Sequence, residues 1–381
     1  MQRRFFMQAT AMVSAATLGA SAWPALAASS ASGARIVRFG QSASLSGGQS
    51  SYGKDVRNGI LAAFAAASAQ EATHGLRFEL NTLDDGGVRA RCLKNVMTLT
   101  EADTVGLVGL TSGAGAEACM PVVEDARIAL LGTASGNMGI RSAAAKGAYH
   151  VRAGYDAEYR RMVSYIKDFG MQRIGVVTLG DTSQANLDAM TQALRQLNIE
   201  PTAAVSIDRN ATSFEAAANE LLAARLDCVL FTANAGPVAR IIDHMHRAKF
   251  PGLFYASSFA GQDLIDTLTA KKQSCVMSMV VPRPTAMGVS VVAQCQRDLA
   301  LLNSDARLGI TTLEGYIAGR TAVEAALVAN KAGGVTRARL RDAIAGLRSD
   351  LGGYRVEFTG SNQGSRYVDL LAVDRFGRLV G

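Results

Sequence analysis

Short apolar runs alternate with helical patterns along nearly the whole chain, and this alternation restricts the fold more than any other feature. Four runs in the first part have the apolar character of strands buried in a parallel sheet. They lie at 36–39, 78–80, 105–108 and 128–131. Val56, Ile60, Phe64 and Ala67 recur at spacings of four and three, which predicts a helix with one apolar face between the first two runs.

A second series of the same kind begins near residue 150. Strands are predicted at 174–177, 229–231 and 253–255, with helical stripes at 159–166, 187–197 and 238–245, and the segment 276–281 comes after them. Longer helical patterns follow at 313–327 and 340–347, and β-like segments at 354–358 and 367–373. Strand and helix in alternation imply right-handed crossovers and sheets covered by helices on both faces. We therefore expect an α/β protein with two doubly wound parallel-sheet lobes.

The first 27 residues have the composition of an export signal. Arg3 and Arg4 precede a stretch of apolar and small residues, and Ala25-Leu26-Ala27 is a small-x-small cleavage site. The alternative is a membrane anchor, but interspersed Gln, Ser and Thr residues dilute the run below a span of about 18–20 apolar residues. We expect cleavage after Ala27, a flexible leader over 28–34, and a periplasmic protein.

The export route stays open between the general secretory and the twin-arginine pathways. Arg3-Arg4 followed by Phe5 and Phe6 resembles a twin-arginine signal, although Gln2 and Gln8 replace its usual Ser and Lys.

The chain has five cysteines, an odd number for an oxidising compartment, so at least one is unpaired within the chain. We expect Cys92 to pair with Cys119. Cys228 lies in an apolar run and is interpreted as a buried, inert thiol, and no cysteine spacing suits zinc.

Composition and motifs argue against several function classes. The net charge of +7 is scattered and aromatic residues make up only 6%, so neither a basic stripe nor a stacking platform for nucleic acid is present. Residues 48–54 match a phosphate-binding loop until Asp55 replaces its Ser or Thr. In 132–136, Ser135 comes one place too late for a nucleophile elbow. We expect no catalytic residues, no cofactor and no metal.

Two acidic residues follow the predicted strand at 78–80. Asp84 and Asp85 could form a carboxylate pair for acid–base chemistry, but Gly86-Gly87 directly after them favours a turn with an acidic start.

Three loops rich in Gly, Ser and Thr follow predicted strands of the first lobe, at 42–53, 110–115 and 132–136. In open α/β sheets ligands bind outside the carboxyl ends of the strands, where helix N-termini offer unpaired amides to an anion. Each loop alone is explained as a tight turn. Three together, with no catalytic base among them, favour binding without chemistry.

The order of several short motifs resembles the periplasmic leucine/isoleucine/valine-binding proteins. The motifs are Phe39-Gly40, Leu45-Ser46-Gly47, Tyr52-Gly53, Asp84-Asp85-Gly86, Val108-Gly109, residues 121–125 and residues 169–174. The resemblance covers residues 35–375. It implies the type I periplasmic-binding fold, a two-lobed clamp with three hinge strands that delivers a solute to an ABC permease. On this reading the first lobe holds 35–152 and 282–352, and the second holds 153–281 and 353–381.

The resemblance also carries ligand contacts onto this chain. In the first lobe they fall on Tyr52, Ser112, Gly113, Ala134, Ser135 and Gly136. Tyr155 lies in the stretch 150–155, which, with 132–136 upstream, resembles a branch of the family whose ligands are often unassigned. In the second lobe the family's aromatic and acidic contacts fall on Thr182, Asn234 and Ser258.

The neutral second-lobe positions argue against a standard aliphatic amino acid. A ligand ammonium buried without a carboxylate would cost several kcal/mol. We expect an exported, non-enzymatic and monomeric receptor for a small carboxylate-bearing molecule. The alternatives are a ligand sensor of the same fold that signals to a membrane partner and, least favoured, an α/β enzyme.

Overall fold

The computed structural model describes residues 34–376 and 378–380. The predicted export signal, its cleavage site and the leader up to residue 33 lie outside the described residues.

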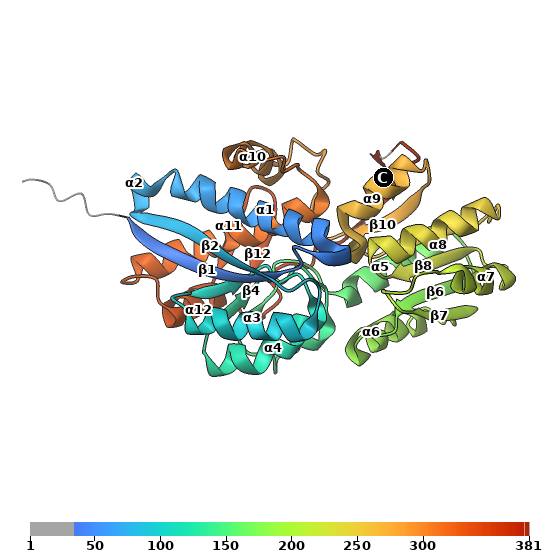
Figure 1. Ribbon diagram of the computed structural model, residues 1–381, viewed down its shortest axis with the longest axis horizontal. Helices are drawn as coiled ribbons and strands as arrows, with labels where there is room; N and C mark the ends of the chain where they lie inside the picture. Colours follow the sequence, from blue (N-terminus) through green and yellow to red (C-terminus); the bar gives the residue numbers. More distant parts are fainter. Residues whose placement is uncertain (1–33, 377, 381) are drawn as a thin grey trace, which may run out of the picture. The chain divides into compact units, whose positions relative to one another are not determined.

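The first sheet has five parallel strands in the order β2-β1-β3-β4-β5 (Figure 1). Its strands are β1 (Arg35–Ala43), β2 (Leu76–Asp84), β3 (Gly106–Val108), β4 (Ala129–Leu131) and β5 (Ala148–Tyr149). The order reverses between β1 and β3, so the sheet is doubly wound. Loops at this reversal point are open to a ligand.

Helices from both ends of the chain cover this sheet. The early ones are α1 (Ser50–Ser68), α2 (Glu71–His74), α3 (Arg89–Glu101) and α4 (Gly113–Asp125), and the late ones are α10 (Ser290–Leu299), α11 (Ile310–Lys331) and α12 (Arg337–Ala345). Helices α1 and α11 pack along each other, as Figure 1 shows. Their approach depends on glycine, because a Cβ on Gly59 would lie 2.0 Å from the carbonyl of Thr312 and one on Gly315 2.1 Å from that of Val56.

The second sheet has seven strands in the order β14-β13-β10-β9-β8-β6-β7. Five are parallel: β6 (Ile174–Leu179), β7 (Ala203–Ile207), β8 (Cys228–Thr232), β9 (Leu253–Ala256) and β10 (Cys275–Met279). Two antiparallel strands, β13 (Asp369–Val373) and β14 (Leu379–Val380), complete one edge. The helices of this part are α5 (Tyr155–Asp168), α6 (Gln184–Arg195), α7 (Glu215–Ala223), α8 (Ala235–Arg247) and α9 (Gly261–Ala270).

Three stretches of chain connect the parts that carry the two sheets. They follow β5, β10 and β12 (Arg355–Glu357). Tyr354 connects two of them, since its hydroxyl lies 2.8 Å from the carbonyl oxygen of Val151 and 3.0 Å from that of Val280. The short strands β11 (Arg348–Asp350) and β12 (Arg355–Glu357) form a hairpin. This hairpin joins residues on both sides of the predicted lobe boundary at 352/353, and the exact division into lobes stays a prediction.

Four 3₁₀ helices complete the described elements: η1 (Gly47–Gln49), η2 (Met138–Ile140), η3 (Ser258–Ala260) and η4 (Ala300–Leu302). The prediction of an α/β fold with two doubly wound sheets is confirmed, with the antiparallel edge of the second sheet as a refinement. Among the described residues, no helix combines the length and apolar character needed to cross a membrane.

Candidate ligand-binding site

A cavity of about 330 Å³ opens at the carboxyl ends of strands from both sheets. The residues that line it follow β2, β3 and β4 of the first sheet, and β6, β7, β8 and β9 of the second. Unpaired backbone groups and helix N-termini collect at such strand ends, so this is where an α/β fold binds ligands.

The N-terminus of α4 forms part of the first-sheet wall. Ser112 caps this helix, and its hydroxyl accepts a hydrogen bond of 3.0 Å from the backbone N–H of Gly115. The N–H groups of Gly113 and Ala114, both at the cavity, belong to the first helical turn and have no acceptor within the helix. A Cβ on Gly113 would lie 2.5 Å from the Ser135 hydroxyl, so glycine keeps this approach open. These amides and the positive end of the helix dipole suit a carboxylate.

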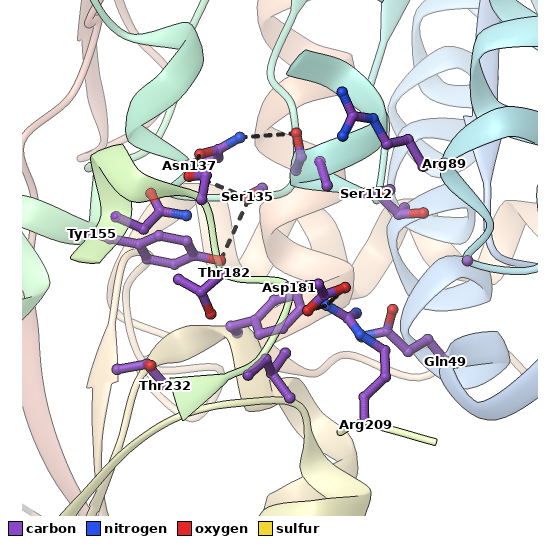
Figure 2. Close-up of a pocket in the computed structure, with 18 of the residues that line it drawn as sticks. Gln49, Arg89, Ser112, Ser135, Asn137, Tyr155, Asp181, Thr182, Arg209 and Thr232 are labelled. Atoms are coloured by element: carbon purple, nitrogen blue, oxygen red, sulfur yellow. Dashed lines mark hydrogen bonds and ion pairs between the residues drawn. The ribbon is translucent and has the colours of Figure 1, made fainter. Parts of the chain in front are cut away.

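Ser135 and Asn137 continue the same wall (Figure 2). The Ser135 hydroxyl accepts a hydrogen bond from the backbone N–H of Asn137 at 3.2 Å and lies 3.4 Å from the Tyr155 hydroxyl. The Asn137 side-chain amide donates to the Gly113 carbonyl at 2.9 Å and to Glu117 at 3.0 Å. Asn137 therefore fixes the loop after β4 against the start of α4.

The second-sheet wall is polar and uncharged where it is most buried. Thr182, Ser183, Asn186, Thr232 and Ser257 line it. Ser257 is 1% exposed, and its hydroxyl has no hydrogen-bond partner among the described residues. Leaving a buried hydroxyl unpaired costs about 1–3 kcal/mol, so a polar ligand atom at this position would be stabilised.

Aromatic side chains form the buried end of the cavity. The rings of Tyr155 and Tyr159 stack with centroids 5.8 Å apart, and Phe259 meets Tyr155 edge-on at 6.4 Å. Burial raises the pKa of both tyrosines, so their hydroxyls stay neutral. This end is suited to an apolar or aromatic part of a ligand.

The charged side chains that line the cavity are Arg89, Asp181 and Arg209. Arg209 forms an ion pair with Asp181, with its Nη2 atom 2.5 Å and 2.7 Å from the two carboxylate oxygens. The lining thus carries one positive charge in excess.

A buried ionic cluster lies directly behind the aromatic end, and we call it the Arg152 cluster: Arg152, Glu158, Glu314, Ser258 and Ser278. The guanidinium of Arg152 lies 5.8 Å from the centre of the Tyr155 ring. It forms ion pairs with Glu158 and, at 3.1 Å, with Glu314, and it donates to the Ser258 hydroxyl at 2.8 Å. Glu158 also accepts hydrogen bonds from the Ser258 backbone at 2.9 Å and from the Ser278 hydroxyl.

Burial shifts the pKa of one group in this cluster and of one group beside it. It raises the pKa of Glu314, against the opposing effect of Arg152. It also lowers the pKa of Arg141 to about 9, with help from the positive charge of Arg152. Arg141 donates to the backbone carbonyls of Arg152 and Ser135, both at 3.0 Å, so it connects the cluster to the cavity wall.

Half of the predicted contacts line the cavity: Ser112, Gly113, Ser135, Tyr155 and Thr182. The other five, Tyr52, Ala134, Gly136, Asn234 and Ser258, do not belong to its lining. The Tyr52 hydroxyl donates to the Ala134 carbonyl at 2.8 Å, and a Cβ on Gly136 would lie 2.4 Å from the Tyr155 ring. These three residues support the wall from behind.

The remaining two residues follow β8 and β9 of the second sheet. Ser258 is bound within the Arg152 cluster, and Asn234 precedes α8 with a buried side-chain oxygen that has no partner among the described residues. As ligand contacts, all ten residues stay predictions.

Sequence reasoning missed several lining residues, including Gln49, Arg89, Asn137, Asp181, Arg209 and Ser257. Asn137 directly follows the loop at 132–136, and Ser257 is the second residue after the predicted strand at 253–255, so the rule for strand ends could have found both. Nothing in the local sequence distinguishes Arg89 and Arg209 from other surface arginines.

The two cysteines expected to pair, Cys92 of α3 and Cys119 of α4, face each other between these helices. Their sulfur atoms are 4.0 Å apart and both are thiols in this structure, so the disulfide stays a prediction. The interpretation of Cys228 as a buried thiol is confirmed, since it is 0% exposed.

The acidic pair at Asp84 and Asp85 forms a turn, as predicted. Asp84 accepts hydrogen bonds from the backbone of Leu45 and Gly86 and from the Ser46 hydroxyl, and that hydroxyl is the main reason its pKa falls to about 2. Asp85 is buried and binds the hydroxyls of Ser42 and Ser44 at 2.8 and 3.0 Å. Within residues 34–376 and 378–380, no cluster of His, Cys, Asp and Glu is suited to a metal ion.

Comparisons with known proteins agree with this geometry. Residues 36–375 match the family model of the periplasmic binding proteins. No curated protein matches the chain.

Several solved structures share the fold. A possible leucine/isoleucine/valine-binding protein from Rhodopirellula baltica is 24% identical with a TM-score of 0.83, covering 93% of this chain and 98% of its own. An extracellular ligand-binding receptor from Verminephrobacter eiseniae is 20% identical with a TM-score of 0.84, over 91% of this chain and 100% of its own. A branched-chain amino acid ABC transporter protein from Thermus thermophilus with bound valine is 16% identical with a TM-score of 0.81, over 91% and 95%. The expected type I periplasmic-binding fold is thereby confirmed.

Proposed function

The chain belongs to the periplasmic binding protein family, and on that premise we propose that it is an exported, non-enzymatic receptor that captures a small carboxylate-bearing molecule and delivers it to an ABC permease. One observation carries the proposal. A single cavity is lined by strand ends of both sheets, and the capped N-terminus of α4 contributes its amides to that cavity.

The charges at the cavity support a carboxylate without a neighbouring ammonium. Asp181, the carboxylate of the lining, is paired with Arg209, and Glu158 behind the wall is paired with Arg152. A ligand ammonium would have to compete with a guanidinium for either carboxylate. The proposed ligands are therefore carboxylic acids, including keto acids and aromatic acids, rather than leucine, isoleucine or valine.

Capture by two walls implies that they move together around the ligand. We propose that the stretches after β5, β10 and β12 act as the hinge, and that the mature monomer begins at Ala28 after export. The likeness to ABC transporter binding proteins supports a permease as the partner. A reconstituted permease that transports only in the presence of this protein would separate transport from sensing.

The ligand class is tested by calorimetric titration. Each branched-chain amino acid is compared with its 2-keto analogue, and the natively purified protein is analysed by mass spectrometry for molecules that co-purify. We expect the keto acids to bind and the amino acids to bind at least about 10-fold more weakly, a difference of about 1.4 kcal/mol. Tight binding of an amino acid without its keto analogue would overturn the proposal.

A further inference from the structure

Two arginines at the open end of the cavity have no role in the carboxylate site at α4. Arg89 begins α3 on the first-sheet side, and Arg209 follows β7 on the second-sheet side. Figure 2 shows both side chains on the side of the cavity where Gln49 lies, away from Tyr155.

Helix stability does not explain Arg89. It is the first residue of α3, where the positive end of the helix dipole makes a cation unfavourable by about 0.3–1 kcal/mol. The first turn of α3 contains no acidic residue, and no other described residue forms a hydrogen bond or an ion pair with the Arg89 guanidinium. An exposed cation placed this way costs stability, and an anion in the cavity would compensate it.

Arg209 is held in place with one edge left over. Asp181 binds the Nη2 atom of Arg209, whereas its Nη1 atom forms no hydrogen bond or ion pair with a described residue. A guanidinium is a planar fork of several N–H donors, so Nη1 can bind a second carboxylate while Asp181 keeps Nη2.

We propose that Arg89 and Arg209 bind a second acidic group, so that the preferred ligand is a dicarboxylic acid. This inference rests on the proposed function: one carboxylate lies at the N-terminus of α4 and the other between the two arginines. The excess positive charge of the lining is then neutralised. Because the two guanidinium groups come from opposite walls, a carboxylate bound to both favours the arrangement in which the walls are close. The aromatic residues permit an apolar or aromatic link between the two acids.

The test compares dicarboxylates with their monoamides, which have nearly the same size but one charge fewer. The probes are terephthalate with 4-carbamoylbenzoate, and the linear series from succinate to suberate with the corresponding monoamides. We expect at least one dicarboxylate to bind about 10-fold or more tightly than its monoamide, since hydrogen bonds to charged groups contribute about 1.5–3 kcal/mol. The preference falls as the salt concentration rises.

Three variants locate the effect. Arg89→Gln and the charge-balanced double variant Arg209→Gln/Asp181→Asn should each remove the preference for the dicarboxylate. Arg91→Gln is the matched control, because Arg91 is an exposed arginine of the same helical turn that does not line the cavity. Thermal melts confirm that all three are folded.

The outcomes separate this inference from the proposed function. If each dicarboxylate and its monoamide bind with equal affinity, and Arg89→Gln changes neither affinity, the second acidic group is overturned. The carboxylate site at α4 is then left in place. If monocarboxylic acids bind and no dicarboxylate does, the second acidic group is likewise overturned and the carboxylate site at α4 is left in place. Binding of leucine in preference to every acid overturns both.

Discussion

Two polar regions lie side by side in this molecule, and they differ in where their hydrogen bonds go. In the Arg152 cluster, charged side chains that are almost completely buried bind one another, and two serines complete the set. At the cavity wall, the Ser257 hydroxyl and the Arg89 guanidinium form no hydrogen bond or ion pair with another described residue. The boundary between the regions runs between two consecutive residues, Ser257 and Ser258.

This difference assigns different roles to the two regions. A buried charge is tolerated only when it is paired, so the Arg152 cluster is a structural element that depends on every member. It connects α5, η3 and β10 of the second sheet with Glu314 of α11, which packs on the first. Unpaired polar groups at a cavity instead lower stability until a ligand binds them.

The largest expected effect comes from breaking the cluster. Arg152→Met should lower the free energy of unfolding by about 3–5 kcal/mol, because it leaves Glu158 and Glu314 buried without their counter-ion. Arg160→Met is the control. It removes an exposed pair with Asp156 and should cost at most about 0.5 kcal/mol. Urea denaturation measures both, and a loss below about 1 kcal/mol for Arg152→Met would show that the cluster does not stabilise the fold.

The sequence predicted the strands and the loops at their ends because both are local. A buried parallel strand needs a continuous apolar run, and 174–177 or 229–231 provides one. The Arg152 cluster is not local, since Arg152, Glu158 and Glu314 meet only after both sheets have formed. Ser258 was therefore expected at the ligand, whereas its hydroxyl binds Arg152 and Glu158.

A smaller effect is expected at the N-terminus of α4. Ser112→Ala removes the cap and should cost about 1 kcal/mol of stability, and it should also weaken carboxylate binding because the first turn of α4 frays. Thr336→Ala removes the corresponding cap of α12 at a similar cost, but Thr336 does not line the cavity. Calorimetry should show weaker binding for Ser112→Ala alone, and equal affinities in the two variants would contradict the proposed carboxylate site.

The smallest effect concerns an acid that forms no ion pair with any residue of 34–376 or 378–380. Asp55 of α1 has its pKa raised to about 7, mainly by burial and further by Asp263 and Asp266 of α9, against the weaker influence of Arg307. The folded protein therefore binds this proton more tightly than the unfolded chain. The associated stability is complete below about pH 4 and is lost as the pH rises through about 7.

Asp55→Asn should remove this dependence. We expect its unfolding midpoint to exceed that of the unmodified protein by about 1–3 °C near pH 8 and by clearly less near pH 5, where only part of the stability has been lost. Asp305→Asn changes an exposed acid that lines the same hollow as Asp55 and serves as the control. A gain that is the same at both pH values would contradict the role of Asp55.

The neighbouring serines provide the most direct test of the central claim, that the cavity wall binds a ligand while the cluster behind it holds the fold. Urea denaturation and calorimetry with the tightest-binding acid are applied to Ser257→Ala and Ser258→Ala. Ser257→Ala should raise the free energy of unfolding of the ligand-free protein by up to about 1–3 kcal/mol, because it removes an unpaired buried hydroxyl, and should weaken binding about 3- to 10-fold. Ser258→Ala should lower the free energy of unfolding by about 1–3 kcal/mol and change the affinity less than about 2-fold. The reverse pattern, or equal effects in both variants, would contradict the account.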